Sequence, residues 1–295
     1  MWKLIKRIVI FFLILGMVMF SNYLINKTII SNTSNAFNDK ISILIAGDSH
    51  PMTAINPDVI CQSRNIAQTG EPYFMTYFKL KRILEDNPTI SKVVLGYSFH
   101  NISAFNDLKF KDSFWATQML DRTYALIPYE RFKEIPLNTE RYFQTVIRRM
   151  LVAPRTDHTK KYVGSFEKKE GMLAQAGLQE TIDKHYFNED KALNISDISV
   201  SYLDSIVGLT GKHQIKLYLT GTPLHAAYRE QIPEKFIKKY RELTTQYLAF
   251  EHVSFIDYSQ LNMDGNLYQD YDHLNYKGSL VFSPLINQKI NNKCR

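Results

Sequence analysis

Ser49 follows directly on a short apolar run, and this position suits a nucleophile. Residues 41–46 read Ile-Ser-Ile-Leu-Ile-Ala and lead into Gly47-Asp48-Ser49-His50. A serine on a tight turn just past a buried strand is held clear of the sheet, where its hydroxyl can meet a substrate carbonyl. The pattern therefore indicates nucleophilic chemistry at Ser49. The ordinary alternative is a serine that only caps the helix that follows.

A serine hydroxyl is almost wholly protonated at neutral pH, so this chemistry needs a general base and a group that orients the base. Near the C-terminus, Asp270 lies three residues before His273, and Asp272 directly precedes the same histidine. One short turn can hold a carboxylate and the imidazole together. His273 is therefore the candidate base, and the two aspartates compete for the orienting role.

The Gly-Asp-Ser block and the Asp-x-x-His block, in this order, resemble the SGNH (GDSL-type) hydrolases and the membrane-anchored O-acyltransferase-like members of that family. The resemblance extends from about Ile41 to the helix after His273. It implies Ser49 as nucleophile, Asp270 as orienting carboxylate and His273 as base. We expect Asp272 to cap the following helix, since a carboxylate directly beside a histidine usually points away from it.

The same resemblance implies an oxyanion hole, in which N–H groups bind the negative charge that develops on the substrate. The Ser49 amide and Gly70, in the block at 65–70, are two expected donors. For the third, the family usually shows Gly-x-Asn-Asp after a strand, where this chain has Gly-Tyr-Ser-Phe-His-Asn. Ser98 takes the asparagine position by spacing, whereas Asn101 is the better donor by chemistry.

No metal or cofactor is expected. His50, His100 and His225 lie near the predicted strand ends, but no two of them have a spacing that would place them on one helical face or hairpin.

The first 26 residues predict an N-terminal signal anchor that spans a membrane. Three cations, at Lys3, Lys6 and Arg7, precede a run at 8–26 that carries no charge. Basic residues ahead of such a run hold the N-terminus in the cytoplasm and send the downstream chain across the membrane. The run has about 19 residues, near the ~20 that span a bilayer, and no clear cleavage site comes after it. We favour an uncleaved anchor over a removed signal peptide.

The rest of the chain predicts one α/β domain. A polar linker at 27–40 leads to a domain at 41–295, and short apolar strands are expected at 41–46, 92–95, 215–219 and 253–256, with helices between them such as 73–84 and 234–248. Buried strands that alternate with helices predict a parallel sheet covered on both faces. The resemblance likewise implies a flavodoxin-like three-layer α/β/α sandwich, the SGNH hydrolase fold. The interval at about 103–199 interrupts this rhythm and predicts a helical insertion.

The composition indicates which classes of binding partner are compatible with this chain. The chain has 295 residues, 45% of them hydrophobic, and a net charge of +7 spread along its length. This dispersed charge suits a protein beside anionic lipids or acidic glycans, and a translocated domain is a poor partner for nucleic acid. Cys61 and Cys294 have no spacing typical of a metal site or a redox pair.

The expected function is that of an extracytoplasmic serine esterase or O-acyltransferase, in the bacterial periplasm or at the cell surface. It would act through an acyl-serine on acyl esters, acetyl above all, of a cell-envelope polysaccharide. A transferase would also need a membrane partner that supplies acyl groups. The alternative is a non-catalytic accessory or glycan-binding protein that keeps the fold.

Overall fold

The computed structural model describes residues 1–37, 40–156, 160–171, 177–188 and 191–290. The chain divides into two compact units, each described by itself below. The first combines Met1–Asn35 with Phe110–Tyr162, and the second combines Ala36–Lys109 with Val163–Arg295.

The second unit is built on a parallel sheet of five strands in the order β2-β1-β3-β6-β7. These strands are β1 (Ile43–Ala46), β2 (Ser63–Asn65), β3 (Lys92–Gly96), β6 (Lys216–Gly221) and β7 (Val253–Asp257). Counted along the chain within this sheet, the order is 2-1-3-4-5, which is the flavodoxin-like arrangement. The predicted fold class is therefore confirmed.

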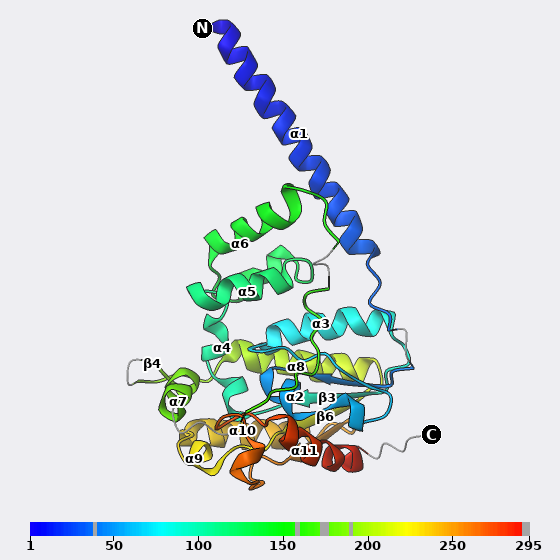
Figure 1. The fold of residues 1–295 in the computed structure, drawn as a ribbon, viewed down its shortest axis with the longest axis vertical. Helices are drawn as coiled ribbons and strands as arrows, with labels where there is room; N and C mark the ends of the chain where they lie inside the picture. The colour runs from blue at the N-terminus through cyan, green and yellow to red at the C-terminus, as the bar shows by residue number, and fades with distance from the viewer. Residues whose placement is uncertain (38–39, 157–159, 172–176, 189–190, 291–295) are drawn as a thin grey trace. The chain divides into compact units, whose positions relative to one another are not determined.

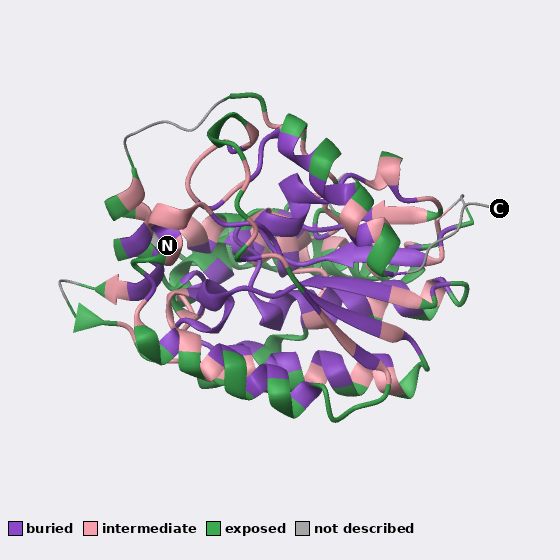
Figure 2. Ribbon diagram, turned by 90° about the horizontal axis from the view of Figure 1, so that it is seen from below, coloured by how far each residue is buried: buried purple, intermediate pink, exposed green. Residues whose placement is uncertain are grey.

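Helices cover both faces of this sheet. The longer ones are α3 (Tyr73–Asp86), α8 (Asp197–Lys212), α10 (Glu234–Tyr247) and α11 (Tyr276–Lys289). Helices α3 and α8 lie on the opposite side of the sheet from α11 (Figure 1). All four residues of β1 are buried, as expected for a strand with helices on both sides. The strands are mostly buried while the helices keep an exposed side (Figure 2).

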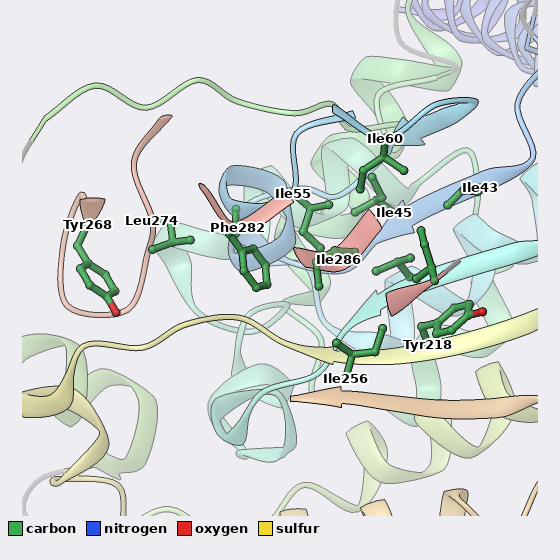
Figure 3. Close-up of a cluster of buried hydrophobic side chains, with 13 residues drawn as sticks. Ile43, Ile45, Ile55, Ile60, Tyr218, Ile256, Tyr268, Leu274, Phe282 and Ile286 are labelled. Atoms are coloured by element: carbon green, nitrogen blue, oxygen red, sulfur yellow. The ribbon is translucent and has the colours of Figure 1, made fainter. Parts of the chain in front are cut away.

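One hydrophobic cluster shows how the α11 face is held. Ile43, Ile45 and Ile256 project from the strands and meet Phe282 and Ile286 of α11 (Figure 3). The two helix residues are four positions apart, so they lie on one face of α11. Burial of such side chains contributes roughly 1.5–3 kcal/mol each.

Shorter elements complete the second unit. They are α2 (Ser49–Ala54), α4 (Phe105–Leu108), α7 (Leu178–Tyr186), α9 (Ala226–Arg229), the 3-10 turns η1 (Pro57–Val59), η2 (Phe99–Ile102) and η5 (Gly265–Leu267), and the antiparallel pair β4 (Phe187–Asn188) and β5 (Lys191–Ala192).

The first unit is helical. It contains α1 (Trp2–Asn32), α5 (Ser113–Thr123), the 3-10 turn η3 (Tyr129–Glu134) and α6 (Thr139–Val146), which continues into the π-helical turn η4 (Ile147–Leu151). An 18-residue window of α1 has a mean hydropathy of 2.4 and is 6% buried. By length and composition, α1 could cross a membrane either as an anchor or as a signal sequence.

Two expected boundaries differ from the observed ones. The predicted linker at 27–40 begins as helix, because α1 continues to Asn32 without a glycine or proline to end it. The predicted insertion at 103–199 is divided, since only Phe110–Tyr162 joins the first unit. Its remainder belongs to the second unit, where Ser196 N donates to Ile102 O.

Cys61 also differs from expectation. It is disulfide-bonded, a bond that the positions of the two cysteines left open but did not favour. Cys294, the other cysteine of the chain, lies outside the described residues.

Replacing Asn26 by leucine is expected to destabilise the first unit. Asn26 is 2% exposed, and its Nδ2 donates to Met150 O at 2.9 Å and to Ala153 O at 3.0 Å, while its Oδ1 accepts from Arg155 N at 2.9 Å. Buried groups left without partners cost about 1–3 kcal/mol. Denaturant unfolding of the full chain in detergent micelles measures this loss. Asn32→Leu, at an exposed position of the same helix, is the control, and equal midpoints for the two variants would contradict the expectation.

Candidate active site

Ser49 lies on a tight turn that leads from β1 into α2. It is the first residue of α2, and the preceding Asp48 caps this helix by accepting from His50 N at 3.0 Å. Gly47 has a φ of +125°, and a Cβ placed there would lie 3.0 Å from Pro51 Cγ and 3.2 Å from Gly96 N. Only glycine fits this turn. The sequence thus presents the Ser49 hydroxyl at the C-terminal edge of the sheet, as expected.

The structure brings Ser49, His273 and Asp270 together. Ser49 Oγ lies 2.7 Å from His273 Nε2, and His273 Nδ1 lies 2.9 Å from Asp270 Oδ1. Asp270 Oδ1 also accepts from His273 N at 2.8 Å, so one turn holds both groups. With a carboxylate at Nδ1, the Nε2 atom is the one that can take the serine proton.

A second carboxylate reaches the same imidazole. Asp272 Oδ1 lies 3.2 Å from His273 Nδ1, and Asp272 Oδ2 lies 3.2 Å from His50 Nε2. The Asp272 side chain is 3% exposed, compared with 41% for Asp270. The expectation that Asp272 caps the next helix is wrong, because Asn275 caps α11 by accepting from Gly278 N at 3.0 Å.

Opposing effects set the charge of this pair. Burial by itself would lower the pKa of His273, but the Asp272 charge and the hydrogen bonds to both aspartates hold that pKa well above its usual value. Burial would likewise raise the pKa of Asp272, yet His273 and His50 hold it well below its usual range. In a buried site, the attraction between imidazolium and carboxylate is strong. The pair therefore favours a protonated His273 beside an ionised Asp272.

Four imidazoles form a column that starts at His273. The ring centroids of His273 and His50 are 4.7 Å apart, those of His50 and His100 4.4 Å, and those of His100 and His185 4.7 Å. His50 Nδ1 lies 3.2 Å from Thr222 Oγ1. The spacing argument for His50 and His100 missed this proximity, because the two rings come from separate elements, α2 and η2, that only the fold brings together.

The inner members of this column are held neutral. Burial and the neighbouring His50 lower the pKa of His100 to about 4, although Asp48 opposes the shift. Burial and His100 lower the pKa of His185 well below its usual value. His185 Nδ1 lies 2.7 Å from Tyr228 OH, and His100 Nε2 lies 2.6 Å from Asp48 Oδ2. A positive charge is thus favoured at His273 and disfavoured at His100 and His185.

Two of the expected oxyanion donors are occupied by internal hydrogen bonds. Ser98 N donates to Asn101 Oδ1 at 2.7 Å, and Asn101 Nδ2 donates to Asp48 Oδ2 at 2.7 Å. The Ser98 N–H therefore already makes an internal hydrogen bond, and the Asn101 side-chain amide is bound to Asp48. His100 Nε2 contacts the same Asp48 carboxylate as Asn101. This contact could not be anticipated from the family pattern, because the sequence departs from that pattern at this loop.

The other two expected donors remain open. Within the described residues, neither the Ser49 N–H nor the Gly70 N–H donates to a protein acceptor. Gly70 has a φ of +69°, and its loop is tied to the nucleophile turn because Gln68 N donates to Gly47 O at 3.0 Å. Backbone N–H groups that have no protein acceptor and lie beside a nucleophile are able to bind an oxyanion.

One group of side chains is compact enough for a metal ion. Among the described residues, the ligand atoms of His50, Asp272 and His273 lie within 4.8 Å of one another. Each of them already has a hydrogen-bond partner, and His273 Nε2 faces Ser49 Oγ. A metal ion there would displace the serine from its base, so this geometry suits nucleophilic chemistry better.

Comparisons with known proteins give little direct guidance. One family model matches residues 155–295, a little under half of the chain. No curated protein matches the sequence.

Solved structures give distant matches. A protein provisionally described as an acylhydrolase, from Bacteroides fragilis, is 14% identical over 90% of this chain and 93% of its own, with a TM-score of 0.40. A GDSL-like lipase from Bacteroides thetaiotaomicron is 14% identical over 92% and 98%, with a TM-score of 0.41. A carbohydrate esterase is 10% identical over 87% and 70%, with a TM-score of 0.33.

Proposed function

We propose that this chain is a membrane-anchored SGNH-type serine esterase or O-acyltransferase. The observation that carries the proposal is the 2.7 Å contact between Ser49 Oγ and His273 Nε2, with carboxylates at Nδ1 of the same ring. Serine, base and orienting carboxylate in this relation form the constellation used for acyl transfer on several unrelated folds.

In the proposed reaction, Ser49 Oγ attacks the acyl carbon while neutral His273 takes the serine proton at Nε2. The open N–H groups of Ser49 and Gly70 bind the oxyanion. The imidazolium then returns the proton to the leaving alcohol oxygen, and an acyl-serine remains. Attack by water on this ester completes an esterase cycle, whereas attack by a glycan hydroxyl completes an acyl transfer.

The proposed substrates are acyl esters, acetyl above all, on a cell-envelope polysaccharide. The N-terminal cations followed by the apolar part of α1 support an extracytoplasmic domain. The disulfide at Cys61 supports the same placement, because disulfides persist in oxidising compartments. In the transferase version, a membrane protein would supply acyl groups. Nucleic acid is not a proposed partner.

The test is labelling of the full chain in detergent micelles by a fluorophosphonate, which phosphonylates activated serines. Wild type should label at one site, and Ser49→Ala should lose the label while keeping the wild-type unfolding midpoint. Ser201→Ala, at an exposed serine of α8, is the control that keeps it. A folded wild type that stays unlabelled would overturn the proposal.

The second candidate is a glycan-binding accessory protein without catalysis. The occupied Ser98 and Asn101 donors favour it, because an oxyanion hole with fewer donors is weaker. If glycan binding survives Ser49→Ala and no label forms on wild type, this second function is the one supported.

The labelling rate is expected to rise with pH through the neutral range. His273 acts as a base only when neutral, and Asp272 holds its pKa well above the usual ~6.5. The fraction of neutral imidazole therefore increases as pH rises toward that elevated pKa. Rates measured from pH 5 to 10 give the midpoint directly. A midpoint below about 6.5 would show that the two aspartates do not control this ring.

A further inference from the structure

The distal part of α1 belongs to the fold of the first unit. Asn22 Nδ2 donates to Leu151 O and to Val152 O at 3.0 Å each, and Asn26 Nδ2 donates to Met150 O and Ala153 O one turn later. These four carbonyls lie at the C-terminal end of η4, where a helix leaves carbonyl groups unpaired. From Asn22 onward, α1 is therefore fixed beside the end of η4.

This attachment leaves a short apolar span. Residues 8–21 carry no charge and precede Asn22. At ~1.5 Å per residue they cover about 21 Å, whereas the hydrocarbon core of a bilayer is ~30 Å thick. Lys3, Lys6 and Arg7 can extend the cytoplasmic end by reaching to the headgroups. At the other end of the apolar span, the turn of α1 that follows residue 21 must supply the rest of the length needed to cross the hydrocarbon core. That turn lies beside η4.

The segment beside that turn exposes apolar side chains. Phe143 is 51% exposed and Ile147 is 47% exposed, and they share one face because they are four positions apart. Val152, directly at the Asn22 contact, is 60% exposed. Tyr142 and Thr145 of the same helix are buried. Helix α6 runs crosswise to α1 (Figure 1), which is the orientation of a helix lying along a membrane that α1 crosses.

The charge of the same unit suits an anionic surface. Residues 110–156 and 160–162 hold ten Lys or Arg and five Asp or Glu. Arg141 and Arg148 are exposed on α6 and η4. Arg141 is two positions before Phe143 and lies on the opposite side of the helix, whereas Arg148 follows Ile147, flanks the apolar face and pairs with Asp121. An amphipathic helix with an apolar face and flanking cations lies in the interface of anionic bilayers.

We propose that α6 and η4 form a membrane-interface segment, with Phe143, Ile147 and Val152 inserted at the headgroup level of the bilayer that α1 crosses. The occupant of this face is the lipid surface itself. The proposal rests on the anchoring role of α1 stated under the proposed function. It also implies that α1 stays attached, because the end of η4 depends on Asn22 and Asn26.

The test places a single tryptophan on either side of α6. The full chain carrying Trp2→Phe and Trp115→Phe receives either Phe143→Trp or Arg141→Trp. Each protein is reconstituted as one copy per nanodisc of phosphatidylcholine and phosphatidylglycerol, with or without brominated acyl chains. Brominated acyl chains should quench the emission of the tryptophan at position 143 at least twice as strongly as that of the tryptophan at position 141. A single copy per disc excludes quenching changes caused by a second copy.

Equal and weak quenching at the two positions would overturn the docking of α6. Extraction with alkaline carbonate separates this failure from failure of the anchor, since an inserted α1 keeps the protein with the lipid. Release into the soluble fraction would overturn the anchor, and with it the docking. Both results are independent of fluorophosphonate labelling at Ser49.

Discussion

Asp272→Asn is expected to lower the second-order rate of fluorophosphonate labelling at Ser49 by about 10³-fold or more, in line with ~10⁴-fold for loss of a buried triad carboxylate. Asp272 is 3% exposed and contacts both His273 and His50. An ion pair away from water is far stronger than one at the surface. Removing this charge weakens the support for the imidazolium that forms as Ser49 loses its proton.

Asp270→Asn is the matched comparison and should cost only about tenfold. Asp270 is 41% exposed, so solvent screens its charge. The asparagine oxygen can still accept the bond that His273 N now gives to Asp270 Oδ1. If Asp270→Asn instead costs the larger factor, the exposed aspartate is the main orienting group, as the family resemblance had implied.

The pH profile separates an electrostatic role of Asp272 from a merely structural one. Loss of the Asp272 charge removes the main influence that holds the pKa of His273 above its usual value. The rising limb of the labelling rate should therefore move to lower pH in Asp272→Asn, even though the plateau is lower. A reduced plateau with an unmoved limb would mean that the substitution only disturbs packing.

Local patterns predicted the strands and the nucleophile turn well. Four apolar runs became β1, β3, β6 and β7, because the strands of a parallel sheet covered by helices need largely apolar segments. The glycine at 47 also follows from local geometry, since its positive φ and its contact with Pro51 exclude a side chain. The short strand β2 was missed, because Ser63–Asn65 carries no apolar run.

The surroundings of the triad were not predictable in the same way. Asp272 reaches His273 because the turn at 270–273 curls back on itself, and His50 meets Asp272 across more than 200 residues of chain. Short-range spacing carries no record of such contacts. The Asn22 and Asn26 contacts were equally unpredictable. Two asparagines in an apolar helix do not by themselves show which carbonyl groups they will bind.

Asp48→Ala is expected to destabilise the protein by about 3–5 kcal/mol, the usual cost of removing one partner from a buried charged contact. Asp48 is 4% exposed and accepts from His50 N, His100 Nε2 and Asn101 Nδ2. Alanine leaves these three donors buried without an acceptor. Denaturant unfolding at pH 7 measures the loss, and Asp58→Ala, at an exposed position, should stay within about 0.5 kcal/mol of wild type.

The pH dependence of the difference in unfolding free energy between wild type and Asp48→Ala tests whether that difference comes from the Asp48 charge. Burial would raise the pKa of Asp48, but His100, His50 and Lys109 hold it well below its usual value. A carboxylate with a lowered folded pKa adds stability above its unfolded pKa of about 3.9, and that stability is lost as pH falls through the folded pKa. The gap between wild type and Asp48→Ala should therefore narrow below about pH 4. A gap that is constant with pH would show that Asp48 acts through packing alone, and the hydrogen bonds from His100 and Asn101 would then not explain how the Ser49 turn is held.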